Sequence, residues 1–341
     1  MKKTASSHKK WLEKHGHWVH FTHRDRMRRK AEMAKAVLPA HLRAVPPTTL
    51  PVDCTGNATV SCPMDANDTL GICGPAMCDH VDGIRSYGQG KAGFSEVHAN
   101  LSALESQYEQ VSGGDNGTDE DMLVGPNGIW LSGIAGDASC VVVDHLDVDM
   151  TDAPLVQYCH DQFYSTCMAW SVPDRFLQEF QTGASFLSPM TPDPQNGHYT
   201  PLSDVDKDGN YRLWSWGTWC WVSPSFVGSV DPQSFVTFSP LQFQKASGYD
   251  SHGRHVSDQA DKWVALGGNA AKVAAVVAMF PPKPAPAPTP PGPAPTSNPP
   301  LAPVLSAIQN ALNGAPALED PNQVMALVTS AITPLYPPGS P

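Results

Sequence analysis

The feature that most constrains the fold is a change of hydrophobic pattern along the middle of the chain. Apolar residues first recur at helical spacing, as in Met77, Val81 and Ile84 and again over residues 95–111. Runs typical of strands follow at 140–143, 163–172, 198–205, 211–216 and 234–238. A helix-rich part followed by a strand-rich part predicts an α+β domain.

The clearest local signal is a hairpin. Asp208-Gly209 lies between the apolar runs 198–205 and 211–216, and Asp-Gly in that setting strongly favours two antiparallel strands joined by a turn. The segment that starts at Asp204 also resembles the beginning of a calcium loop. Its twelfth position holds Ser215 rather than the bidentate glutamate, so the hairpin is the favoured interpretation.

Cys73 stands at a predicted helix start. A polar turn, Asn67-Asp68-Thr69, precedes it, and Pro75 suits the first turn of a helix. The helix dipole and the unpaired N–H groups of a first turn favour a thiolate, which predicts that Cys73 is a nucleophile. The alternative is a cysteine that simply fills core, which is how we interpret Cys78 one turn further on.

A nucleophilic cysteine needs a base, and His198 at the start of the hairpin, 125 residues after Cys73, is the candidate. This arrangement resembles the papain-like cysteine peptidase superfamily. Leu213-Trp214-Ser215-Trp216-Gly217-Thr218 looks like the Asn-Ser-Trp-Gly-Thr segment of that superfamily. Asn67, six residues before Cys73, occupies the place of its oxyanion-hole glutamine.

A closer resemblance is to papain-fold-like proteins from phages, prophages and bacterial genomes. They share the order Asn-Asp-Thr-Leu-Gly-x-Cys (67–73), Tyr-Glu-x-x-x-Gly (108–113), Thr-Asp (118–119), Gly-Ile-Ala-Gly (133–136), Gly-His (197–198) and Ser-Trp-Gly (215–217). The order matches over roughly residues 60–245. The resemblance implies a papain-like α+β fold, with the cysteine on the helical part and the histidine on an antiparallel sheet.

The resemblance also implies a mechanism. His198 would take the Cys73 proton, and the sulfur would attack a peptide or amide carbonyl. The backbone N–H of Cys73 and the side chain of Asn67 would stabilise the oxyanion. No cofactor and no metal are implied.

One position departs from the family pattern. Trp214 stands where papain-like enzymes carry the asparagine that orients the histidine, and an indole cannot accept its hydrogen bond. Asp204 shares a strand with His198 but is too far along it, and Ser215 should face away from Trp214. The third residue is therefore unassigned. This gap favours the alternative function, a catalytically inactive papain-like fold used as a structural or packaging protein, phage-associated for instance.

Charge separates the N-terminus from the rest. Residues 1–50 hold 12 Lys/Arg against 3 Asp/Glu, whereas the remainder holds 10 against 30. A basic arm of this kind predicts contact with nucleic acid or an anionic surface through residues 1–44, and a solvated, disordered leader is the alternative. Six of the 13 histidines also lie in the arm, where a polyelectrolyte is favoured over a metal site.

The composition predicts four parts. They are a basic arm (1–50), the α+β domain (51–280), a proline-rich linker (281–303) and a short C-terminal segment (304–341). Two short amphipathic helices in the last part, at 304–312 and 324–335, cannot bury much surface alone and should dock on the body, on a copy of themselves or on a partner.

Targeting segments bear on the cellular compartment of the protein. We recognise no signal peptide and no transmembrane run, which favours a cytoplasmic or phage-associated protein with mostly reduced cysteines. Cys54 and Cys62 could pair if the compartment were oxidising.

Overall fold

The computed structural model describes residues 60–67, 69–87, 92–114, 117–285 and 309. The chain divides into two compact units, Met1–Lys283 and Pro284–Pro341, and the account below concerns the first. The expected basic arm lies outside the described residues, as do most of the linker and nearly all of the expected C-terminal helices.

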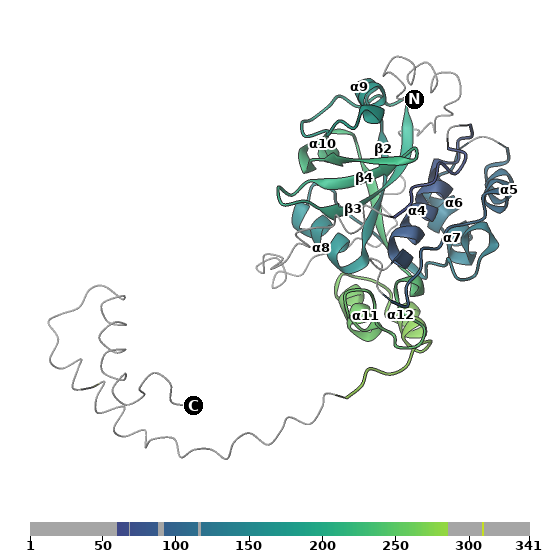
Figure 1. The fold of residues 1–341 in the computed structure, drawn as a ribbon, viewed down its shortest axis with the longest axis vertical. Helices are drawn as coiled ribbons and strands as arrows, with labels where there is room; N and C mark the ends of the chain where they lie inside the picture. The colour runs from purple at the N-terminus through teal and green to yellow at the C-terminus, as the bar shows by residue number, and fades with distance from the viewer. Residues whose placement is uncertain (1–59, 68, 88–91, 115–116, 286–308, 310–341) are drawn as a thin grey trace. The chain divides into compact units, whose positions relative to one another are not determined.

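The helical part is organised around α4 (Cys73–Tyr87), which begins where the sequence pattern predicted a helix start. All of α4 except Tyr87 is buried, so it is a central helix with no solvent-facing side. The elements that follow are α5 (Leu101–Ser112), α6 (Glu120–Val124), α7 (Ile129–Ser132) and the 3-10 turn η3 (Ile134–Gly136). Figure 1 shows them, in purple and blue, gathered on one side of the strands.

Side-chain caps fix the ends of α5. The Asn100 side chain accepts a hydrogen bond from the Ala103 N–H, so the helix begins at Leu101 and not near residue 95, where the apolar pattern placed it. Gly113 ends the helix with φ 67° and donates its N–H to the Glu109 carbonyl.

Within the described residues, six strands form one sheet in the order β1-β6-β2-β3-β4-β5, and every neighbouring pair is antiparallel. The strands are β1 (Asp144–Asp147), β2 (Ser165–Ser171), β3 (Gly197–Val205), β4 (Tyr211–Ser215), β5 (Thr218–Val222) and β6 (Gln233–Phe238). The hairpin is confirmed, and β2 and β6 lie within the runs that predicted them or one residue beyond. The predicted strand at 140–143 is wrong, because pairing begins at Asp144, and β5 was not predicted.

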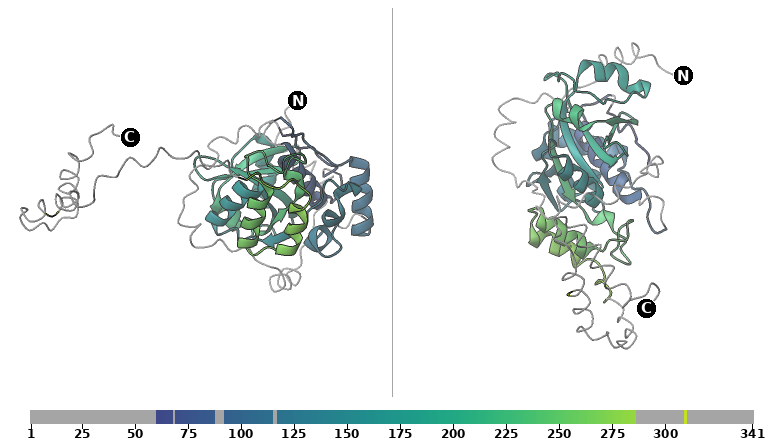
Figure 2. Two further views of the ribbon diagram at one scale, coloured as in Figure 1. Left: turned by 90° about the horizontal axis from the view of Figure 1, so that it is seen from below. Right: turned by 90° about the vertical axis from the view of Figure 1, so that its left-hand side faces the viewer.

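Helix α8 (Ala153–Phe163) follows β1. Its cap is the Asp152 carboxylate, which accepts the Leu155 N–H. Six further helical elements were not predicted: α9 (Asp174–Glu179), η4 (Phe180–Thr182), α10 (Pro224–Ser229), η5 (Pro240–Gln242), α11 (Val256–Ala265) and α12 (Ala270–Val277). The last two lie side by side, in green, in Figure 2.

The sheet is buried on both faces. On one face Ala169 and Tyr199, opposite each other in β2 and β3, pack in one cluster with Met77 of α4. On the other face Met168 and Leu202 belong to a larger cluster that includes residues of α8 to α12. Every residue of β2, β3 and β4 is buried because both faces are covered, and this includes polar residues such as His198, Asp204 and Arg212.

This combination of helices with one antiparallel sheet confirms the predicted α+β class. Among the described residues, no helix has both the length and the apolar character that crossing a bilayer requires.

Candidate active site

Cys73 lies at the start of α4, directly after a tight turn. Asp65 and Ala66 adopt left-handed backbone conformations with φ 50° and 55°. The Ala66 carbonyl accepts hydrogen bonds from the N–H groups of Thr69 and Leu70, both at 2.9 Å. The chain reverses here and enters the helix with Cys73 only 2% exposed.

Burial controls the charge of this thiol. Loss of solvent raises the pKa of Cys73 to about 12, although the backbone N–H groups of Tyr199, Gly74 and Cys73 itself act in the opposite direction. The sulfur is therefore protonated at neutral pH. The thiolate expected from the helix start is outweighed by desolvation.

His198 is the second residue of β3, opposite Trp170 of β2. Its Nε2 lies 2.6 Å from Ser215 Oγ, and its ring stacks on Trp216 with centroids 4.3 Å apart and an interplanar angle of 11°. Burial, assisted by the charge of His80, lowers the pKa of His198 to about 3. The imidazole is therefore neutral and can accept a proton.

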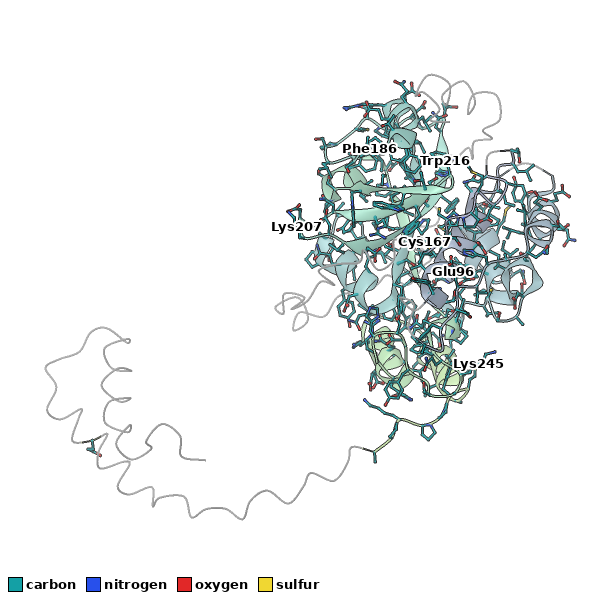
Figure 3. The ribbon with its side chains drawn as sticks, in the orientation of Figure 1. Glu96, Cys167, Phe186, Lys207, Trp216 and Lys245 are labelled. Atoms are coloured by element: carbon teal, nitrogen blue, oxygen red, sulfur yellow. The ribbon has the colours of Figure 1, made fainter. Side chains whose placement is uncertain are left out.

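The fold places Cys73 beside the backbone of β3, next to the residue that follows His198. Helix α4 packs on β3, and the backbone N–H of Tyr199, the residue after His198, interacts with the Cys73 sulfur. Figure 3 labels Trp216, which stacks on His198, where the strands meet the layer of α4 to α7. Of the hydrogen bonds between described residues, none joins Cys73 to His198. Catalytic hydrogen bonds are often long before substrate binds, so the dyad stays a prediction.

Ser215 is the partner of the imidazole that sequence reasoning did not assign. Trp214, at the position that papain-like peptidases fill with asparagine, donates its indole N–H to Ser203 Oγ at 2.7 Å. The Asp204 carboxylate lies 3.2 Å from a guanidinium nitrogen of Arg212. Neither side chain orients the histidine, and the serine hydroxyl occupies that place.

A β-bulge explains this outcome. Next to the turn, Val205 pairs with Tyr211, and a regular ladder continued from there would pair Leu202 with Trp214. Leu202 instead pairs with Leu213. The extra residue is Asp204, which has φ 49°. A shift of one residue moves every later side chain to the other face, so Ser215 rather than Trp214 faces the histidine. The only sequence signal was an aspartate that tolerates positive φ, which is too weak to predict a bulge.

Asn67 lies in the turn before α4 and is 8% exposed. Its backbone N–H donates to the Met64 carbonyl at 2.9 Å. Its side-chain amide makes no hydrogen bond to any described residue, so its part in an oxyanion hole stays a prediction.

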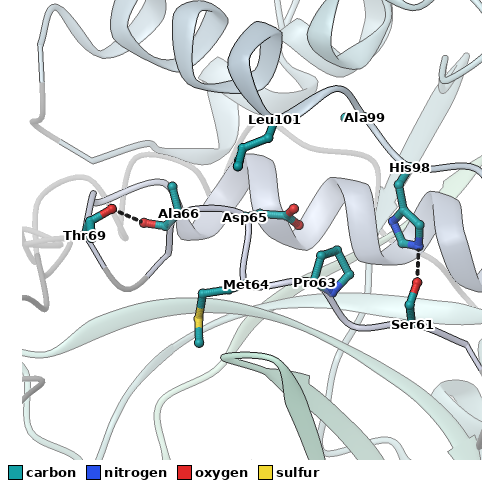
Figure 4. A pocket seen from close by; sticks show the side chains of 9 residues that line it. All are labelled: Ser61, Pro63, Met64, Asp65, Ala66, Thr69, His98, Ala99 and Leu101. Carbon is teal, nitrogen blue, oxygen red and sulfur yellow. Dashed lines mark hydrogen bonds between the residues drawn. The ribbon is translucent and has the colours of Figure 1, made fainter.

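A second polar cluster borders a cavity of about 580 Å³ beside α4. His98 Nδ1 lies 2.5 Å from Asp79 Oδ2, and its Nε2 lies 2.6 Å from Glu96 Oε1 and 2.9 Å from Ser61 Oγ. Figure 4 shows Ser61 and His98 at one end of this cavity. Burial alone would lower the pKa of His98, but Asp79 and then Glu96 raise it to about 9. An imidazolium held by two carboxylates cannot accept the serine proton.

In the turn of the β3–β4 hairpin, an acidic side chain accepts hydrogen bonds from the backbone of the turn itself. The Asp206 carboxylate accepts the backbone N–H groups of Asp208 and Asn210 at 2.9 and 2.8 Å. Within the described part of the chain, no group of three or more His, Cys, Asp or Glu residues could hold a metal ion.

No model of a protein family matches the sequence, and no curated protein does. Among solved structures, the chain is similar to xylellain, a cysteine protease from Xylella fastidiosa. The two share 9% sequence identity over 66% of this chain and 96% of that one, with a TM-score of 0.45.

Proposed function

We propose that the chain is a papain-like thiol hydrolase or acyl transferase that acts on peptide or amide bonds through Cys73 and His198. One observation supports this more than any other. The sulfur at the start of α4 interacts with the backbone of β3 next to a neutral histidine whose Nε2 is fixed by Ser215. With Nε2 engaged, Nδ1 is the nitrogen that can take the thiol proton.

The reaction starts from two neutral groups. As the Cys73 sulfur bonds to the carbonyl carbon, its proton passes to His198 Nδ1, and the carbonyl π electrons move to oxygen. The first N–H groups of α4 have no intrahelical acceptor and can stabilise that oxyanion together with the Asn67 amide. The imidazolium then protonates the departing amine, and water hydrolyses the acyl-enzyme.

The test is covalent labelling with a peptidyl electrophile directed at thiols. We expect adduct on Cys73 and at least about a hundredfold slower labelling in His198→Ala, because the proton acceptor is lost. His145→Ala is the matched control, since His145 lies in β1, three places from β3 in the sheet. Equal labelling of Cys73 in the two variants would contradict the proposal.

The second candidate is a catalytically inactive fold that binds partners. It is favoured by the burial that keeps Cys73 protonated and His198 neutral, with no hydrogen bond between them. In this case residues 1–44 would bind nucleic acid or an anionic surface, residues 304–341 would bind a protein, and the protein would serve in packaging, in the cytoplasm or in a phage particle. Absence of any Cys73 adduct, with the arm still required for binding, would support it.

A further inference from the structure

Cys62 differs from the other cysteines in exposure. Of the seven cysteines that the structure describes, six are buried and Cys62 is half-buried. It belongs to the extended segment that precedes the turn at Asp65 and leads into α4. A soft electrophile therefore reaches this sulfur more readily than it reaches Cys73, which is 2% exposed.

A histidine of α4 lies next to this sulfur. Cys62 Sγ is 3.8 Å from His80 Nε2, and the same nitrogen lies 2.8 Å from the Pro63 carbonyl oxygen and 3.3 Å from Asp65 Oδ2. His80 is 3% exposed, so these contacts are made in a region of low dielectric. When the thiol carries its proton, it donates to the Thr218 carbonyl at 3.5 Å.

His80 places a positive charge beside this sulfur. Burial alone would lower the pKa of His80, but the neighbouring Cys62 and Asp65 raise it well above its ordinary value. The buried ring is then an imidazolium held between a carboxylate and a sulfur. A positive charge 3.8 Å from a sulfur favours its attack as a nucleophile.

A cavity of about 580 Å³ lies along the segment that carries Cys62. Ser61 and Pro63, the two neighbours of Cys62, line it together with Asp65. Asp65 is 8% exposed, and its Oδ2 is paired with His80 but makes no hydrogen bond among the described residues. In Figure 4 the Asp65 carboxylate lies in the middle of the cavity wall, between Pro63 and Leu101.

We propose that Cys62 is a reactive thiol, activated by the neighbouring His80, that exchanges with small disulfides. Cys62 enters the reaction after losing its proton to solvent. Its sulfur bonds to one sulfur of the disulfide, and the other leaves as a thiolate with the electron pair of the broken S–S bond. His80 keeps its proton throughout. This site is separate from Cys73 and does not depend on the proposed hydrolase activity.

The test uses the full chain with Cys54→Ser and a small chromogenic disulfide, dithiodipyridine, at neutral pH. Modification of each cysteine is followed by peptide mass spectrometry. We expect Cys62 to react first, and about tenfold faster in the folded chain than in the same chain in concentrated guanidinium chloride. A thiol that is merely exposed reacts no faster folded than unfolded.

Two variants separate activation from exposure. His80→Gln should reduce the folded-state rate at Cys62 to the unfolded value or below, whereas His160→Gln, which alters a buried histidine of α8, should leave it unchanged. If His80→Gln does not fold, the test rests on the parent chain, through the ratio of the Cys62 reaction rate in the folded state to that in the unfolded state. A ratio of one or less at Cys62 overturns this proposal. Faster reaction at Cys73 overturns it too, while supporting the hydrolase proposal.

Discussion

At Cys73 the start of a helix and the burial of the sulfur act in opposite directions. The helix end supplies N–H groups that stabilise an anion, but desolvation raises the pKa of the thiol to about 12. At His98 the balance is reversed, because two carboxylates outweigh the loss of solvent. The charge of each group therefore depends on its nearest partners, which the sequence does not identify.

Ser215 provides the first prediction at this scale. Ser215→Ala removes the hydroxyl 2.6 Å from His198 Nε2 and leaves a buried ring nitrogen without its partner. We expect a loss of about 1–3 kcal/mol in the free energy of unfolding, measured by urea titration. Ser225→Ala, at an exposed position, is the control and should change it by less than about 0.5 kcal/mol. Equal stability of the two variants would contradict the assignment.

His98 predicts a loss of stability at alkaline pH. Its pKa is about 9 in the folded chain and about 6.5 in an unfolded one, so the folded state holds the extra proton between those values. The contribution to stability is complete below about pH 6.5 and disappears as the pH rises through 9. Partial exposure of the side chain limits it to about 2 kcal/mol.

The measurement is the difference in unfolding free energy between the parent chain and His98→Gln, taken across this pH range so that other titrating groups cancel. If the difference in unfolding free energy does not shrink as the pH rises, Asp79 and Glu96 do not hold the proton on His98.

At the scale of elements, the approach of α4 to its neighbours depends on a residue without a side chain. A Cβ on Gly74 would overlap the Thr118 hydroxyl, just before α6, and would come within 3.2 Å of the methyl groups of Leu123 in α6. The glycine therefore permits the close packing that positions the start of α4.

Gly74→Ala should destabilise the fold by about 1–3 kcal/mol, because α4 must move away from α6. Gly228→Ala in α10 is the matched control, since a Cβ there meets nothing within 4 Å and should stabilise the helix by up to about 1 kcal/mol. Thermal unfolding of both variants gives the comparison, and a neutral Gly74→Ala would mean that the helices can separate without cost.

For the whole molecule, the segregated charge predicts where nucleic acid would bind. Residues 1–50 carry a net charge of +9, against −20 for the remainder, so the body repels a polyanion. We expect binding to random-sequence duplex DNA that weakens steeply with salt and disappears on deletion of residues 1–44. Fluorescence anisotropy measures it, and deletion of residues 284–341 is the control. Binding that survives loss of the arm would remove this proposal.

Much of the fold could be predicted because its signals are local. The start of α4, the hairpin at Asp208-Gly209 and the positions of β2 and β6 each depend on residues within one turn or one strand. The prediction failed where a cap or a bulge of a single residue decided the outcome, as at Asn100 and Asp204. Helices α11 and α12 were missed altogether.

The sequence by itself determined a helix beginning at Cys73, a hairpin beginning near His198 and the α+β class, since chain-local propensity and turn chemistry are sufficient for these. Tertiary structure alone decided that Ser215 contacts His198, that Cys73 is buried as a thiol and that Cys62 lies beside His80. These contacts join segments far apart in the chain, and strand register and burial, which no local pattern encodes, determine which side chains meet and which of them carry charge.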